Sequence, residues 1–199
     1  VFFGDTLIVN GGHLRPLNPS DTKGMSRSYM LGRKTAEQYH KALKEYLPDA
    51  FRDSYLAETA PLMGVRESRR IKGKYTLTLE DYVSRRSFSD EIARNSYWLD
   101  CHPSGNEEKT IQVNPDDNYK KGDSHGIPFR CLIPENISNL LVAGRCISVE
   151  RIVLSSTRVM PNCLATGEAA GIAATLAIKE NTDVCNISGE QVMEIIKSN

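Results

Sequence analysis

The sequence predicts an α/β protein with mixed sheets, and three observations predict it. Residues 71–79, IKGKYTLTL, alternate apolar and polar side chains with the period of a half-exposed strand. Residues 140–143 form a short apolar run that ends at Gly144, typical of a buried strand. Pro161 then suits the first position of a long helix, which we expect to end near Glu180.

Two helical segments are expected in the N-terminal third. Ser26 can cap a helix that Pro48 ends, and its apolar stripe is Ala36, Tyr39, Leu43 and Leu47. A second helical segment is expected over residues 55–63. The stretch before the first helix is rich in Gly, Pro and Asn and is predicted to be a loop after an edge strand.

The middle of the chain alternates predicted strands with turns. Thr78 and Asp81 have the spacing of a capping box, which predicts a helix through Tyr82 and Val83. Residues 95–102 and 127–134 are expected to be strands, and the polar, turn-rich segment between them is expected to be a loop or hairpin insertion. A last helix is predicted over residues 189–197.

The long helix near the C-terminus is the most informative predicted element. Proline has no N–H to lose at a helix start, so the N–H groups of Asn162, Cys163 and Leu164 should mark its positive end. Small residues, Gly167, Ala170, Gly171 and Ala174, lie on one side of this helix. They fit either ordinary tight packing or a ligand site that Gly144 and residues 145–158 would complete.

Composition and charge exclude several classes of function. The 199 residues carry 25 Lys plus Arg and 25 Asp plus Glu, so no overall charge attracts nucleic acid or an anionic membrane. Five cysteines without a C-x-x-C pair are expected to be buried thiols, and no metal site is predicted. The start, VFFGDTLIVN, lacks an initiator methionine and a signal-peptide pattern, so we expect it to be a cut in a longer chain.

Several ordered motifs resemble one protein family. The run NLLVAGRCIS…STRVMPNCLATGEAAGIAATLAI resembles the C-terminal flavin-binding segment of the FAD-dependent oxidoreductases, which are more distantly related to fumarate reductase and glutathione-reductase-type flavoproteins. The upstream blocks GVRESRRIKGKYTLTLEDY, FSDEIARNSYWLDCH and GIPFRCLIP look similar too, so the likeness covers roughly residues 50–180. No G-x-G-x-x-G fingerprint for the ADP half of FAD occurs in the chain.

The resemblance implies a division of the chain. Residues 1–125 are expected to be a substrate or cap-type region, and residues 126–199 the C-terminal strand and helix of an FAD-binding domain. The expected partners are a small-molecule substrate and an N-terminal FAD-binding portion of the same protein, with no nucleic acid and no membrane. The chain alone is expected to be inactive and to self-associate through an apolar surface around Leu140–Val142.

The resemblance also implies cofactor-binding residues. Gly144 would allow close approach of the backbone to FAD, while Arg145, Cys146, Ile147 and Ser148 would face its pyrophosphate or ribityl chain. The remaining expected contacts, at the flavin ring and along the helix, are Arg158, Val159, Met160, Pro161, Asn162, Cys163 and Gly167. Many related flavoproteins have an acidic residue where this chain has Arg145. The alternative is that Arg145 and Arg158 are solvated surface charges.

The candidate catalytic residues are Arg66, Glu67, Arg69 and His102. Arginine offers a rigid fork for substrate oxygens, although Glu67 could simply neutralise its neighbours. His102 could take up the proton that hydride transfer from an alcohol or amine releases, or could be a structural histidine. The expected function is therefore hydride transfer between a polar small molecule and FAD. The alternative is a non-catalytic binding or interaction module on a reused scaffold.

Overall fold

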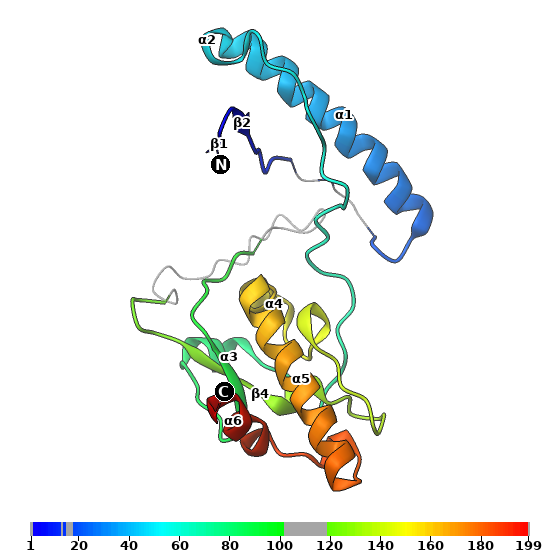
Figure 1. Cartoon of the computed structure of the whole chain (residues 1–199), viewed down its shortest axis with the longest axis vertical. Helices are drawn as coiled ribbons and strands as arrows, with labels where there is room; N and C mark the ends of the chain where they lie inside the picture. The colour runs from blue at the N-terminus through cyan, green and yellow to red at the C-terminus, as the bar shows by residue number, and fades with distance from the viewer. Residues whose placement is uncertain (1, 13, 15–17, 102–118, 199) are drawn as a thin grey trace. The chain divides into compact units, whose positions relative to one another are not determined.

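The computed structural model describes residues 2–12, 14, 18–101 and 119–198 (Figure 1). The chain divides into two compact units, whose described residues lie before and after the boundary between Val65 and Arg66. Both helices and antiparallel strands are present, which confirms the mixed fold class. The sequence predicts a functional division at residue 125, between a substrate region and an FAD-binding segment. The boundary between the two compact units reflects packing and does not test this division, which stays a prediction.

The N-terminal unit contains one long helix. Strands β1 (Phe2–Phe3) and β2 (Thr6–Leu7) pair antiparallel, and α1 (Thr22–Tyr46) and the short α2 (Pro48–Phe51) follow them. The predicted cap at Ser26 is wrong, because Asp21 caps α1 by accepting from the Lys23 N–H at 3.1 Å. The helix predicted over residues 55–63 is also wrong: Pro61 removes a donor and disfavours helix at the residue before it.

The C-terminal unit is built around a two-stranded hairpin. Strand β3 (Glu91–Asn95) pairs antiparallel with β4 (His125–Pro128), and the helices α5 (Met160–Glu180) and α6 (Gly189–Ser198) neighbour β3 (Figure 1). Helix α3 (Leu79–Val83) neighbours α4 (Arg151–Thr157). The buried core belongs to this unit and includes Leu77, Tyr82, Ile127, Phe129 and Leu154. The predicted helices at the C-terminus and the capping box of Thr78 and Asp81 are confirmed.

The predicted strand over residues 71–79 does not form a continuous ladder, because the chain bends at Lys74 and Tyr75 and helix α3 already begins at Leu79. Leu77 and Gly73 each make one isolated bridge, to Val149 and Pro134 respectively. The segment takes backbone partners from both sides: the Lys74 N–H donates to Ile133, and the Leu77 N–H donates to Ser148. Because its partners alternate between two neighbouring segments, no single neighbour pairs along its length.

Three predicted strands are shorter than expected or missing. β4 ends at Pro128, and the 3-10 helix η2 (Phe129–Leu132) follows where a strand was predicted. Residues 96–101 are not a strand, because the Asn95 side chain accepts from the Tyr97 N–H at 3.0 Å and turns the chain after β3. Residues 140–143 are not a strand either. They lie between two left-handed residues, Asn139 and Gly144, and the Val142 N–H donates to Leu132.

Candidate functional site

The loop at Gly144 is fixed to helix α5 by one side chain. Gly144 has φ +74°, a left-handed conformation that favours glycine, and it begins the 3-10 helix η3 (Gly144–Cys146). Its N–H donates to Thr166 Oγ1 at 3.0 Å. Thr166 is buried on α5 and its hydroxyl lies 2.9 Å from the Asn162 carbonyl oxygen. The predicted convergence of Gly144 and the start of this helix is therefore present.

The first turn of α5 differs by one residue from the prediction. The helix begins at Met160, so Pro161 takes the second position, and the Cys163 N–H donates to the Val159 carbonyl at 3.2 Å. The N–H groups that helix geometry leaves without an acceptor are those of Met160 and Asn162, rather than those of Cys163 and Leu164. No side chain of the described residues caps this end. The positive end of the helix dipole still lies beside the Gly144 loop.

Arg145 links this loop to the segment before α5. Its Nε donates to the Arg158 carbonyl oxygen at 3.3 Å, and the Cys163 Sγ lies 3.6 Å from the same oxygen. Burial raises the pKa of the Cys163 thiol, although the neighbouring Arg145 guanidinium opposes the shift. The thiol is therefore protonated near neutral pH, and Cys163 can pack and donate weakly but is a poor nucleophile.

Asp100 joins two of the predicted site arginines. Its Oδ2 lies 3.2 Å from Arg66 Nη1 and 3.6 Å from Arg158 Nη2. Arg158 Nη2 also donates to the Asp100 carbonyl oxygen at 2.7 Å. The Arg158 side chain is only 10% exposed, so the alternative of a solvated surface charge is wrong for it, whereas Arg145 is exposed. One continuous set of contacts thus connects a predicted substrate residue with predicted cofactor residues.

The GVRESRR segment does not form a cluster of its own ion pairs. Arg66 pairs with Asp100, while Glu67 Oε1 lies 3.5 Å from Arg151 Nε at the start of α4. Arg69 is exposed. The other predicted catalytic residue, His102, lies outside the described residues. Of the three candidates that the structure describes, Arg66 is the one that these contacts bring into the same cluster as Arg158.

The remaining predicted cofactor residues divide between core and surface. Ile147 and Ser148 are buried in the core, where Ser148 Oγ lies 2.8 Å from Thr76 Oγ1, so they are not brought to the surface with Arg145. Cys146, Met160, Pro161 and Gly167 are exposed, and Val159 is half-buried. A Cβ at Gly167 or Gly171 would meet nothing within 4 Å. The helix is therefore open at Gly167 and Gly171 within the described part of the chain, whereas Ala170 and Ala174 are half-buried against the core and Ala169, Ala173 and Ala177 are buried.

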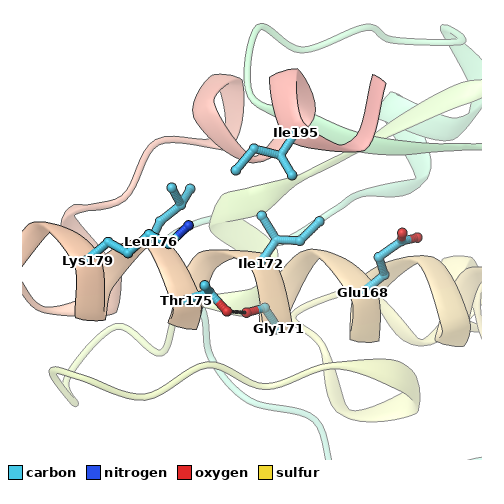
Figure 2. A pocket seen from close by; sticks show the side chains of 7 residues that line it. All are labelled: Glu168, Gly171, Ile172, Thr175, Leu176, Lys179 and Ile195. Atoms are coloured by element: carbon cyan, nitrogen blue, oxygen red, sulfur yellow. Dashed lines mark hydrogen bonds between the residues drawn. The ribbon is translucent and has the colours of Figure 1, made fainter. Parts of the chain in front are cut away.

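A shallow groove of about 330 Å³ runs between α5 and α6 (Figure 2). Its lining residues are Glu168, Gly171, Ile172, Thr175, Leu176, Lys179 and Ile195. Glu168 and Lys179 lie toward opposite ends of the view, and the apolar side chains lie between them (Figure 2). None of these residues belongs to the Gly144, Arg145 and Arg158 cluster.

The cysteines and the candidate metal ligands bear on two sequence predictions. All five cysteines are free thiols, but only Cys131 is buried and Cys146 is exposed, so the expectation of five buried thiols is wrong. Among the residues that the structure describes, no group of three His, Cys, Asp or Glu side chains is placed to hold a metal ion. Within the same described ranges, no helix has the length and apolarity needed to cross a bilayer.

A comparison with protein families shows which family this chain belongs to. The model of a family described as FAD dependent oxidoreductase matches residues 4–196. The chain belongs to the FAD-dependent oxidoreductase family. The match confirms the resemblance in the sequence and identifies FAD as the cofactor of this family. Comparisons with curated proteins and with solved structures found no match, so the predicted relation to fumarate reductase and glutathione-reductase-type flavoproteins stays a prediction.

The donor set around Gly144 fits a flavin cofactor. It combines the Arg145 guanidinium, the N–H groups of Met160 and Asn162 at the start of α5, and a glycine whose Cβ would meet only Cys163, at 3.9 Å, in the described part of the chain. Positive charge and N–H donors suit the electron-rich edge of a flavin or a phosphate oxygen. Two residues of this candidate site were not predicted from the sequence, Asp100 and Thr166. Asp100 lies two residues before His102, a spacing that could have indicated it.

Proposed function

We propose that this flavoprotein transfers a hydride between a polar small molecule and FAD bound beside Gly144. One observation carries the proposal: contacts of 2.7–3.6 Å connect Arg66, Asp100 and Arg158, and the Arg158 carbonyl accepts from Arg145. Residues expected at the substrate and residues expected at the cofactor therefore lie in one cluster. Hydride transfer needs such proximity, because the two reacting groups must be in contact.

The residues that would hold the cofactor follow from the same geometry. When bound, FAD supplies the two-electron redox chemistry of the site. The Gly144 loop would approach it with its backbone, and Arg145 would neutralise a phosphate or an electron-rich ring edge. The start of α5 would add the N–H groups of Met160 and Asn162 and the positive end of the helix dipole. Each of these interactions favours a cofactor that gains negative charge.

The residues that would meet the substrate come from the GVRESRR segment. The Arg66 side chain is 39% exposed and its guanidinium is held by Asp100, so it can present N–H donors in a fixed direction. Glu67 pairs with Arg151, so it serves to position the segment rather than to neutralise Arg66. Arg69 and His102 complete the proposed set, with His102 as the group that takes up a proton.

The proposal includes a second portion of the same protein. A nucleotide fingerprint for the ADP half of FAD is needed, and it does not occur in these residues. Apolar side chains exposed on α5 and just before Gly144 support such a packing partner: Leu164, Ile178 and Leu140. The same surface would drive self-association of the 199-residue chain when it stands alone.

The test is the colour of the purified full-length protein. We expect a yellow protein whose absorbance bleaches anaerobically when a polar alcohol or amine from a substrate panel is added. Arg66→Ala should keep the flavin and lose bleaching by substrate while still bleaching with dithionite. A colourless protein that does not take up added FAD would overturn the proposal and favour a binding module without redox chemistry.

A further inference from the structure

The groove between α5 and α6 is an apolar surface whose two ends carry opposite charges. Ile172 and Leu176 of α5 and Ile195 of α6 form its apolar lining (Figure 2). Glu168 lies toward one end and Lys179 toward the other. Both are exposed, and within the described ranges neither of them forms an ion pair. The two charges are therefore available to an oppositely charged partner.

The floor of the groove between these charges has little polar character and one open space. The Thr175 hydroxyl donates to the Gly171 carbonyl oxygen at 2.9 Å, so its donor is satisfied within the helix. A Cβ at Gly171 would meet no atom of the described residues within 4 Å. An occupant of the groove can therefore bring an apolar side chain close to the α5 backbone at Gly171.

The α5 side of the groove is complementary to itself when the helix is reversed. A twofold axis midway between Glu168 and Lys179 relates α5 to an antiparallel copy, in which Glu168 of one chain lies opposite Lys179 of the other. The same axis places Leu176 opposite the open space at Gly171. A parallel copy would place each charge opposite a like charge, so the charges select the antiparallel arrangement.

We propose that two copies of this protein associate through the α5–α6 groove, with their α5 helices antiparallel. Each copy contributes the same patch, so a pair of Glu168 with Lys179 forms at each end of the interface. Burial of the apolar lining supplies most of the affinity, because exposed ion pairs contribute little, and the charges set the direction of the helices. Leu164 and Ile178, which are proposed to contact a second portion of the same protein, do not line this groove, so the two contacts use different residues.

The test measures the oligomeric state of the full-length protein by sedimentation velocity at micromolar concentrations, where we expect a dimer. Glu168→Lys and Lys179→Glu should each raise the dissociation constant of the dimer by about tenfold or more, because each change makes two attractive contacts repulsive. A double variant with both changes exchanges the charges and should dimerise like the parent protein. An equimolar mixture of the two single variants should form heterodimers, because one then carries only positive and the other only negative charge at these positions.

Glu190→Lys is the matched control, because it makes the same change of charge on α6 at an exposed residue that does not line the groove. It should dimerise like the parent protein. A monomeric parent protein overturns the inference, whether or not another part of the protein covers the groove. A dimer that neither single change weakens, or a mixture that forms no heterodimers, overturns it too. Should one single variant fail to fold, unchanged dimerisation by the other would overturn it equally.

Discussion

The conformation of Gly144 determines which substitution can test the cofactor site. At φ +74° a side chain with a Cβ is strained by roughly 1–2 kcal/mol, and a β-branched residue more so. Valine at this position would therefore lower stability whether or not a cofactor approaches. Asparagine tolerates the left-handed region better, so Gly144→Asn is the informative change.

We expect Gly144→Asn to lose flavin while its free energy of unfolding stays close to that of the parent protein. The reason is that, among the residues that the structure describes, a Cβ here would meet only Cys163, at 3.9 Å, so its added atoms would occupy space on the proposed cofactor side. Absorbance measures the flavin content of the variant, and urea unfolding measures its free energy of unfolding. Full flavin occupancy in Gly144→Asn would show that Gly144 is needed for the turn alone.

His125 gives the C-terminal unit a defined pH dependence. It is fully buried on β4 beside Tyr82 and Tyr119, and its Nδ1 is hydrogen-bonded to the Tyr119 hydroxyl. Burial, with a contribution from the Arg94 charge, lowers the pKa of His125 from 6.5 to about 4. The unfolded chain therefore binds more protons than the folded chain between these two pH values, so stability falls as pH drops through this window.

Protonation of His125 should lower the free energy of unfolding by about 3 kcal/mol between pH 6.5 and pH 4. Above pH 7, His125 is neutral in both states and does not make stability depend on pH. Urea unfolding at pH 7.0, 5.5 and 4.0 measures this loss. His125→Gln cannot be protonated, so its free energy of unfolding should change much less over the same range. Equal pH slopes in the parent and variant proteins would contradict the assignment to His125.

At the scale of elements, the sequence predicted best where a local signal decided the structure. The capping box of Thr78 and Asp81 and the proline at the start of α5 act within one turn, and both are present. Strands were predicted less well, because pairing depends on residues distant in sequence. Residues 140–143 carry the apolar pattern of a buried strand, yet left-handed residues stand at both ends of the run and Leu140 is exposed.

The same distinction between local signals and distant contacts explains which residues of the candidate site the sequence predicted. The sequence indicated Gly144, Arg145 and the start of α5 through a contiguous motif, and the structure brings them together. Asp100 and Thr166 act through side-chain contacts across 58 and 22 positions of sequence. Ser148 was expected beside the cofactor on its position in the motif, but the Thr76 hydroxyl pairs with it in the core. Contacts of this kind depend on tertiary packing, so the spacing of residues in the sequence does not predict them.

At the scale of the whole molecule, the two units differ in how their helices are stabilised. Helix α1 has 25 residues and none of its side chains is fully buried, so intrahelical hydrogen bonds, the Asp21 cap and polar contacts such as His40 with Ser54 and Tyr29 with the Met63 N–H hold it. Helix α5 buries five side chains, Asn162, Thr166, Ala169, Ala173 and Ala177, in the C-terminal unit. Local opening should consequently cost much less free energy in α1 than in α5.

We therefore expect the amide hydrogens of α1 to exchange with solvent well before those of α5 and of the β3–β4 hairpin. Hydrogen–deuterium exchange followed by mass spectrometry resolves the three segments in one experiment. Asp21→Ala should speed exchange in α1 further, because losing a helix cap costs about 1 kcal/mol, and should leave α5 unchanged. Protection of α1 equal to that of α5 would mean that contacts with another part of the protein, rather than its own hydrogen bonds, stabilise this helix.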